Sequence, residues 1–475
     1  MALFGVFLGL FIVAVYIWLT SKGKKWKKIP GRAYRTVELM YAEKNKWMNA
    51  TAVNAITFYQ GNVDTSVVVK RLYEILKANP WLACRLVKEN GKDIHMEFPE
   101  EIGPSDLSRH YTEIQIDNNR GHNPFNESAS IETLFSRVEK HLIKIGRECI
   151  NLDELLFKVI LVKITDKNNT EVNKTAFILS LSHTIGDGHT FYQVYSMFNY
   201  NTKVQPLIVE REHKFIQYME AINGNKLISY FKSPLIVLSI LTHRLLLSLR
   251  GKHAKLFSYE VKKEEISKLK SLFLPTKKSS TTENNKNNNN SNSNDNDSSI
   301  SFLSTNDILT SWFLKKLACS YGFMVINYRN RLVEFTNQLA GNYEHVLFYS
   351  QRDYQLPNQI RKSLQLFKSE HQDIPNLFET IRYEFGLVTN WSSFYQEVIL
   401  QKECPLLVHL PLMSRDGVAM KGAMVIYCPR KMLWVFISLS MRISPPMRIG
   451  WRDRPSCSII STDPAGGDSS LDDKS

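Results

Sequence analysis

The apolar positions in the first half of the chain predict strands that are buried on both faces. Residues 155–164 and 176–182 are mainly apolar, and residues 53–59 combine apolar and β-branched side chains. Apolar runs of this length, bounded by turn-forming residues, are typical of strands that are covered on both sides. The turn-rich segment 166–173 separates the last two runs. These strands are therefore predicted to form the core of a sheet.

A helical period follows the first of these strands. Apolar residues at helical spacing predict a helix over residues 66–78, with Asp64 or Thr65 as its cap. The pair Asn79-Pro80 ends it, because the residue before a proline avoids the helical region. The apolar face consists of Val68, Val69, Leu72, Ile75 and Leu76. Strands and helices without strict alternation indicate an α/β sandwich-like lobe.

The predicted strand over 176–182 leads into a six-residue segment, His183–Gly188, with the sequence His-Thr-Ile-Gly-Asp-Gly. A neutral histidine at the end of a buried strand can take a proton from a hydroxyl or amine while that group attacks an acyl carbon. Phe191, Val194, Tyr195 and Phe198 then recur at helical spacing and predict an amphipathic helix. The alternative is an ordinary strand-to-helix turn whose histidine lies on the surface.

Composition divides the chain into folded parts and segments that cannot build a core. With 475 residues, of which 43% are hydrophobic, the chain is long enough for two lobes. Segment 276–299 is rich in Asn and Ser, and segment 441–475 is rich in Pro, Ser, Gly and Asp. Both are predicted to be disordered, the first as a linker between the lobes. After the linker, Ser304 and Asp307 form a Ser-x-x-Asp cap that predicts a helix start.

Residues 1–21 are predicted to be a membrane anchor. The run Ala2–Thr20 has no charged residue, and as a helix it would span about 28 Å, close to the hydrocarbon thickness of a bilayer. A cleaved signal peptide is the alternative, but it would carry positive charge before a shorter apolar core. Here the basic residues follow the apolar run. By the positive-inside rule the rest of the chain faces the cytosol, and we expect a single-pass protein of the endoplasmic reticulum.

The net charge of +14 does not indicate nucleic-acid binding, because half of the excess lies in the basic cluster after the anchor. No nucleic-acid partner is expected. The six cysteines are scattered, without a Cys-x-x-Cys pair or a metal-ligand spacing, as in a reducing compartment. Glycosylation sequons at Asn49, Asn126 and Asn173 would then be unused. Glycans on them would contradict the predicted topology.

A second apolar stretch, residues 235–249, has two interpretations. It is short for a membrane span and is interrupted by His243 and Arg244. One interpretation is a buried helix. The other is a helix in the membrane interface beside a site for a lipophilic substrate.

Together these features resemble the acyltransferase superfamily that includes the plant BAHD enzymes, wax ester synthases, chloramphenicol acetyltransferase and peptide-synthetase condensation domains. The segment His183–Gly188 matches its His-x-x-x-Asp-Gly signature. Weaker similarities follow in the family's order at Asn79–Leu86, Lys255–Lys270, Ser304–Trp312, Gly341-Asn342 and Thr389–Phe394. The resemblance implies an α/β fold with two chloramphenicol-acetyltransferase-like lobes, residues 35–275 and 300–440, a channel between them, and the N-terminal transmembrane helix in front.

The resemblance also implies roles for single residues. His183 would be the general base of a direct transfer without an acyl-enzyme, so acyl-CoA would be a co-substrate and no cofactor or metal would be needed. Gly188 would give the loop freedom and let the substrate approach closely. Thr389, two residues before Trp391, matches a position whose hydroxyl can stabilise an oxyanion. Plain strand packing is the alternative for Thr389 and Trp391.

Asp187 would brace the loop, in this family usually through an arginine. The sequence does not identify that arginine, because segment 334–342, where the family often carries it, contains none.

Three departures bear on the branch. Ser182 precedes His183, where wax ester synthases and condensation domains commonly have a second histidine, and this favours a BAHD-like branch. The BAHD motif Asp-Phe-Gly-Trp-Gly is absent, since the comparable segment is Val398–Pro405. The anchor is unusual for BAHD enzymes and points to a lipid acceptor or product.

We therefore expect a membrane-anchored, acyl-CoA-dependent O-acyltransferase that acts on a lipophilic alcohol as a monomer. One alternative is a non-catalytic lipid- or acyl-CoA-binding protein on the same fold. Another is an amide-forming condensation enzyme, disfavoured because the chain shows no carrier domain. A metal hydrolase using His183, Asp187 and His189 is disfavoured by a spacing that is unusual for zinc.

Overall fold

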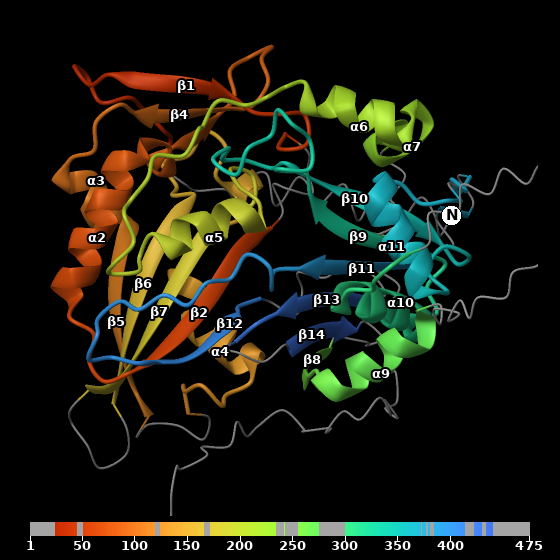
Figure 1. Ribbon diagram of the computed structural model, residues 1–475. Coiled ribbons are helices and arrows are strands. Elements are labelled where there is room, and N and C mark those ends of the chain that lie inside the picture. Colours follow the sequence, from red (N-terminus) through yellow and green to blue (C-terminus); the bar gives the residue numbers. More distant parts are fainter. Residues whose placement is uncertain are drawn as a thin grey trace, which may run out of the picture.

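The computed structural model shows two lobes side by side (Figure 1). It describes residues 24–44, 51–118, 124–165, 172–233, 242, 255–274, 300–371, 373–376, 379–380, 384–413, 422–429 and 434–439. The predicted anchor, linker and C-terminal tail lie outside the described residues, as does the apolar stretch 235–249 except residue 242. Among the helices of the described part, none is both long and apolar enough to cross a membrane.

The sheet of the first lobe has five strands in the order β12-β2-β7-β6-β5. Strands β5 and β6 are parallel, and the other neighbours are antiparallel. The strands are β2 (Ala52–Gln60), β5 (Tyr111–Asp117), β6 (Phe157–Thr165), β7 (Val172–Ser182) and β12 (Leu406–Pro411). The predicted strands over 53–59, 155–164 and 176–182 correspond to β2, β6 and β7, so the apolar runs located the centre of this sheet.

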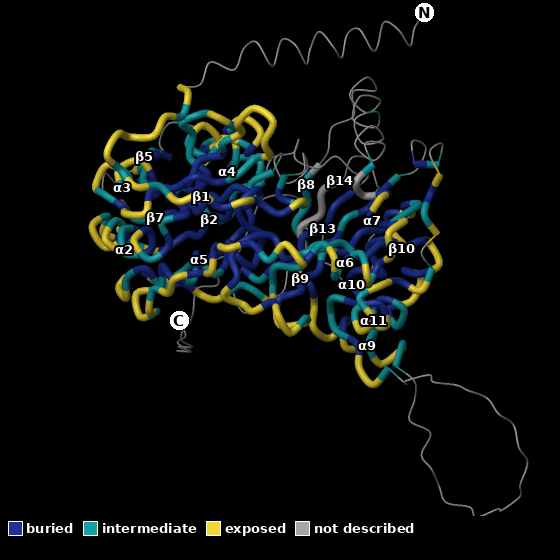
Figure 2. Tube along the Cα trace, turned by 90° about the horizontal axis from the view of Figure 1, so that it is seen from above, coloured by how far each residue is buried: buried dark blue, intermediate teal, exposed yellow. Residues whose placement is uncertain are grey.

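Alternate residues of the central strands enter two separate cores, because successive side chains of a strand point to opposite faces. On β7, Phe177 and Leu179 pack with helices α2 (Thr65–Ala78) and α5 (Gly188–Ser196). On the other face, Ile178 packs with α4 (Ile131–Val138). Figure 2 shows these buried segments running through the interior, with exposed residues on the outer sides of the helices. Both faces are covered, which explains the continuous apolar runs.

The helix predicted over 66–78 is α2, and Asp64 is its cap: the Asp64 carboxylate accepts a hydrogen bond from the Ser66 amide. A small sheet in the order β1-β4-β3 combines a strand that precedes β2 with two strands that follow α2. Its strands are β1 (Tyr34–Glu38), β3 (Arg85–Val87) and β4 (His95–Pro99), and the helix α3 (Pro104–His110) follows.

The sheet of the second lobe has six strands in the order β10-β9-β11-β13-β14-β8. Its strands are β8 (Lys255–Glu260), β9 (Tyr321–Asn327), β10 (Glu344–Ser350), β11 (Phe385–Asn390), β13 (Gly422–Tyr427) and β14 (Trp434–Leu439). The helices are α6 (Phe215–Asn223), α7 (Asn225–Lys232), α9 (Lys263–Phe273), α10 (Thr305–Leu317) and α11 (Pro357–Leu366). The predicted cap is present at the start of α10, where Ser304 and Asp307 form a reciprocal capping box.

Each half of the chain contributes one edge strand to the sheet of the other lobe. The two sheets therefore do not follow the predicted boundaries 35–275 and 300–440. Strand β8 precedes the linker but pairs with β14 in the second sheet. Strand β12 comes from the second half of the chain but pairs with β2 in the first sheet. Both exchanged strands cover an edge that would otherwise expose unpaired backbone groups. The exchange fixes the two lobes against each other around the loop after β7.

Candidate active site between the lobes

The segment His183–Gly188 forms the tight connection between β7 and α5. Strand β7 ends at Ser182, and α5 begins at Gly188. Asp187 is the N-cap of α5, since its carboxylate accepts a hydrogen bond of 2.9 Å from the Thr190 amide. The loop also bonds to the second lobe, because the Asp187 amide donates to the Gly341 carbonyl. The predicted strand, loop and helix are thus present, and the loop lies where the lobes meet.

Asn342 from the second lobe fixes the imidazole of His183. The Asn342 amide nitrogen Nδ2 donates to the His183 carbonyl at 2.9 Å and to Glu43 Oε1 at 3.2 Å. These two acceptors orient the amide, so its oxygen Oδ1 accepts from His183 Nδ1, 2.9 Å away. In neutral His183 the proton is therefore on Nδ1, and Nε2 carries the free lone pair. This is the tautomer that a general base at Nε2 requires.

Glu344, the first residue of β10, lies on the other side of the same imidazole. Its Oε1 is 3.4 Å from His183 Nε2, and the two side chains are 15% and 20% exposed. Burial raises the pKa of Glu344 to about 7, with His183 opposing the shift and the Asp187 carboxylate adding to it. A carboxyl group that changes charge near neutral pH thus faces the nitrogen that would act as the base.

The Asp187 carboxylate forms a closed ion pair with Arg329. Their closest atoms are 2.6 Å apart, and the side chains are 1% and 0% exposed. Burial opposes ionisation of Asp187, but the Arg329 guanidinium and the hydrogen bonds hold the pKa of this carboxyl below its ordinary value. Arg329 also donates to Thr190 Oγ1 and to the Gly341 carbonyl. Arg329 is the partner of Asp187 that the sequence did not identify, because it lies just before segment 334–342.

A second buried ion pair holds the loop from the other end. Arg211 Nε lies 2.9 Å from Glu43 Oε2, and both side chains are fully buried. Arg211 donates to the carbonyls of Ile185 and Ala340, so it joins the loop to the second lobe. Gly341 lies against this pair with φ +123°, and a Cβ there would be 2.8 Å from Arg211 Cζ. Only glycine fits this place.

The structure brings Gly188 and Trp391 together. A Cβ on Gly188 would lie 3.5 Å from Trp391 Nε1, an ordinary contact, and the φ of Gly188 is outside the left-handed region. The loop therefore does not use the conformational freedom of Gly188, and the residue instead lets the indole lie close. Trp391 is partly buried against both cores of the first lobe. Thr389 is half-buried on β11 opposite Val425 of β13, and no contact joins its hydroxyl to His183 among the described residues.

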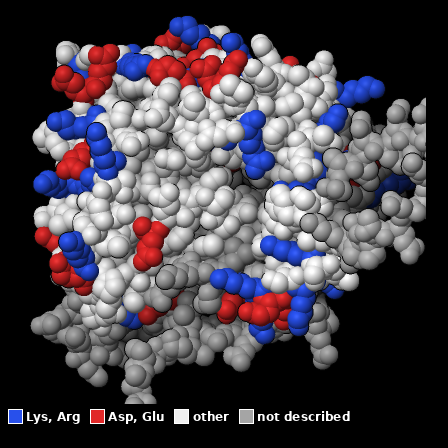
Figure 3. Space-filling model, in the orientation of Figure 1, with Lys and Arg blue, Asp and Glu red and all other residues white. Residues whose placement is uncertain are grey.

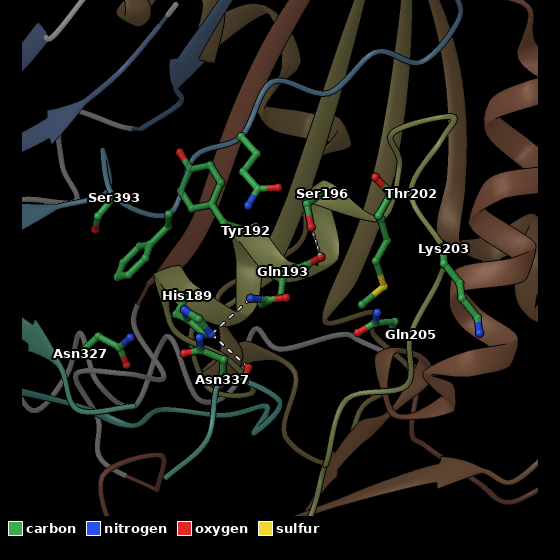
Figure 4. Close-up of a pocket in the computed structure, with 13 residues that line it drawn as sticks. His189, Tyr192, Gln193, Ser196, Thr202, Lys203, Gln205, Asn327, Asn337 and Ser393 are labelled. Atoms are coloured by element: carbon green, nitrogen blue, oxygen red, sulfur yellow. Dashed lines mark hydrogen bonds between the residues drawn. The ribbon is translucent and has the colours of Figure 1, made fainter. Parts of the chain in front are cut away.

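A cavity of about 420 Å³ opens along one face of α5, beside the loop but without His183 in its wall (Figure 4). His189 lies at its base, with Nε2 donating to the Asn337 carbonyl at 3.1 Å. Burial, assisted by Arg329, lowers the pKa of His189, so this ring stays neutral. The polar residues of the wall offer donors and acceptors to a polar part of a ligand: Gln193, Ser196, Thr202, Lys203, Gln205, Asn327, Ser393 and Gln396. Figure 3 shows few charged side chains around the hollow centre of this face.

His409 secures the exchanged strand β12 beneath α5. Its Nε2 lies 3.0 Å from the Tyr192 hydroxyl, and its Nδ1 lies 2.9 Å from Thr57 Oγ1. Burial lowers the pKa of His409 to about 3, and the ring stacks on Tyr395 at 4.5 Å. A neutral, fully bonded histidine of this kind is a structural contact between the two halves of the chain.

The residues proposed for the metal hydrolase do not converge. Asp187 is bonded to Arg329, and His189 is bonded to Asn337. Within the described ranges, the group of three ligand side chains whose atoms lie close together is Glu89, His95 and Glu97, next to the small sheet.

The sequence alone does not mark the four charged residues around the loop: Glu43, Arg211, Arg329 and Glu344. Arg211, Arg329 and Glu344 contact the loop from other parts of the sequence, Glu43 acts through Arg211 and Asn342, and none has a local pattern that distinguishes it from surface charge.

Comparisons with known proteins identify the fold. No family model matches the sequence, and no curated protein is significantly similar to it. The first condensation domain of the CDA synthetase matches with a TM-score of 0.51 and 11% identity over 85% of this chain and 90% of that chain. The same domain in complex with a substrate analogue also has a TM-score of 0.51, with 91% of that chain covered.

The match to F. graminearum TRI101 complexed with coenzyme A and deoxynivalenol has a lower TM-score of 0.48, with 11% identity over 85% of this chain. The identities are low, and the comparisons therefore establish the fold and not the substrate. The predicted two-lobe α/β fold is confirmed: the chain has the fold of a condensation domain, with His183–Gly188 between its lobes.

Proposed function

We propose that this protein is an acyltransferase that moves an acyl group from a CoA thioester to the hydroxyl group of a lipophilic alcohol, with His183 as the general base. The observation that carries the proposal is the hydrogen bond from His183 Nδ1 to Asn342 Oδ1, which leaves Nε2 as the basic nitrogen. The His183 side chain is 20% exposed, so the ring is not closed off from solvent.

The proposed reaction needs only one proton acceptor. His183 Nε2 takes the proton of the acceptor hydroxyl while its oxygen attacks the thioester carbonyl carbon. The C–S bond then breaks, and Nε2 returns the proton to the leaving CoA thiolate, which departs as the thiol. Asp187 and Arg329 hold the loop, and their closed ion pair has no part in the proton transfer. Thr389 remains the candidate donor to the oxyanion, on the family resemblance alone.

The lipophilic nature of the acceptor rests on the sequence of the N-terminus. The uncharged run Ala2–Thr20 followed by a basic cluster would hold the enzyme at a membrane with its lobes in the cytosol, where CoA thioesters are made. Alkaline extraction of membranes tests this part. The full chain should stay in the pellet, a chain lacking residues 2–21 should be released, and glycans on Asn126 or Asn173 would refute the topology.

The activity is tested with membranes that contain the protein, labelled acyl-CoA, and a panel of alcohols, diols and amines. We expect ester formation with release of CoA, and a loss of about 10²- to 10⁴-fold in kcat for His183→Ala. His213→Ala removes an exposed histidine near α6 and is the matched control, with activity unchanged. Binding of acyl-CoA without CoA release for any acceptor would instead indicate a non-catalytic protein, and amide formation alone would indicate the condensation reaction.

A further inference from the structure

Glu344 is in an unusual place for a structural carboxylate. It begins β10, and its Oε1 lies 3.4 Å from His183 Nε2, whereas the opposite nitrogen of the ring is bonded to Asn342. At 3.4 Å the carboxylate is within the range of a strong Coulomb interaction but too far for a short hydrogen bond. The lone pair of Nε2 is therefore near a negative charge and still available to an acceptor hydroxyl.

The other charges around this pair are already compensated. On the loop, Asp187 is paired with Arg329, and behind Asn342, Glu43 is paired with Arg211. Across the strand pair, Glu344 faces the neutral Asn327 of β9. The next residue on β10, His345, has a pKa lowered to about 4 by burial and is neutral above that pH. Among the described residues, His183 is the positive partner with the largest effect on Glu344, and the paired Arg329 has a smaller one.

We infer that Glu344 is a positioning residue for the His183 base, whose carboxylate stabilises the imidazolium that forms when Nε2 takes the proton of the acceptor. This inference rests on the proposed function. The carboxylate itself neither gains nor loses a proton during the transfer: the proton moves from the acceptor oxygen to Nε2 and then to the leaving thiolate. An anion beside the imidazole favours its protonated form and so strengthens the base.

The pair also sets the working pH. When the Glu344 carboxyl is protonated it is neutral and no longer places a negative charge beside Nε2. The pKa of about 7 for Glu344 places the loss of this proton near neutrality. Because the two groups are coupled, the activity reports the titration of the pair and not of either residue.

The inference is tested with Glu344→Gln, which keeps the shape of the side chain and removes its charge. In wild type, kcat/KM should rise with pH to a midpoint near the titration of the pair. In the variant the midpoint should move to lower pH by about one unit or more, since no anion retains the proton. The plateau of kcat at high pH should fall about 10- to 100-fold, the effect of one charge-assisted interaction, with KM little changed. Glu334→Gln, at a carboxylate that is 48% exposed, is the control and should leave the profile unchanged.

A readout independent of activity separates this inference from the proposed function. The imidazole signals of His183 can be followed by NMR against pH in histidine-labelled protein and assigned with His183→Gln. A titration midpoint that moves to lower pH in Glu344→Gln supports the pair even if no acceptor is ever acylated. Identical titrations in wild type and variant, or an unchanged pH profile in an active variant, would overturn the inference while leaving the base role of His183 intact.

Discussion

A carboxylate lies at each of the two ends of the His183–Gly188 loop, but the two carboxylates have different kinds of partner. At the Asp187 end, a carboxylate meets a permanently charged guanidinium at 2.6 Å with no exposed surface. At the His183 end, a carboxylate meets an imidazole at 3.4 Å with both groups partly exposed. The first carboxyl has a pKa below its ordinary value, and the second has a pKa raised to about 7. Burial opposes ionisation of both carboxyls, but the permanently charged guanidinium and the hydrogen bonds outweigh it at Asp187, whereas His183 offsets it only in part at Glu344.

This comparison separates a structural ion pair, Asp187–Arg329 (the brace), from a site of proton transfer at His183. The Asp187 end is closed by hydrogen bonds from Thr190 and Tyr343 as well as Arg329, so that its charges have no access to substrate. At the His183 end, Asn342 holds both the backbone carbonyl and Nδ1 of His183, and Nε2 faces the Glu344 carboxylate at 3.4 Å. A loop that carries a reactive histidine thus obtains its rigidity from the end that takes no part in the chemistry.

Breaking the brace should give the largest loss of stability. Arg329→Met leaves the Asp187 carboxylate buried without its partner, and we expect the free energy of unfolding to fall by about 3–5 kcal/mol in urea denaturation at neutral pH. Arg35→Met removes an exposed ion pair with Glu210 and should cost about 0–1 kcal/mol. Equal losses in the two variants would contradict the role of the brace.

The same experiment has a defined pH dependence. The pKa of Asp187 is lowered in the folded protein, so its contribution to stability is present above the unfolded pKa of about 4 and is lost as the pH falls through the folded pKa. The difference between wild type and Arg329→Met should therefore shrink below about pH 4.

A side chain placed against the second buried ion pair, Arg211–Glu43, should have the next largest effect on stability. In Gly341→Ala the new Cβ would lie 2.8 Å from Arg211 Cζ, and φ is +123°. Gly224 also has a positive φ of +78°, but a Cβ there would meet nothing within 4 Å. Gly341→Ala should therefore lose about 1–3 kcal/mol more than Gly224→Ala in the same unfolding assay. A smaller loss than in Gly224→Ala would show that Arg211 moves aside freely.

Releasing the base should separate activity from stability. Asn342→Leu removes the acceptor of His183 Nδ1–H, and we expect kcat to fall about 10-fold, the worth of one hydrogen bond, beyond any loss of folded protein. Asn79→Leu removes a buried asparagine that bonds to the chain at Leu207 and Gln205 and makes no hydrogen bond to His183 among the described residues. It should lower the stability and leave the kcat of the folded enzyme unchanged, so a similar fall of kcat in both variants would refute the specific role of Asn342.

The smallest expected loss of stability concerns His409, which, like Asp187, is buried and hydrogen-bonded to its neighbours. Tyr192→Phe leaves His409 Nε2 without its partner and should cost about 0.5–1.5 kcal/mol of unfolding free energy. Tyr218→Phe, at a hydroxyl that bonds Glu334 on the surface, is the control and should cost close to nothing. A loss of kcat in Tyr192→Phe larger than its loss of stability would assign this contact to the reaction.

The local sequence was sufficient for elements whose stability comes from nearby residues. The apolar runs located β2, β6 and β7, and capping residues such as Asp64 and Ser304 located the starts of α2 and α10. The loop after β7 was found for the same reason, since the end of a strand and the start of a helix both leave local signals.

The exchange of β8 and β12 between the sheets left no such signal. A strand has the same pattern whichever sheet it joins, and its partner is chosen by the burial of edges and side chains far away in sequence. The boundaries of the lobes therefore could not be derived from composition shifts alone.

The sequence by itself determined the type of fold, the strand-loop-helix unit and the histidine within it. The tertiary structure alone decided what that histidine can do: it brought Asn342 to Nδ1, Glu344 to Nε2 and Arg329 to Asp187. The physical reason is that hydrogen bonds and charge pairs act over a few ångströms in space, whereas these partners lie more than a hundred residues apart along the chain.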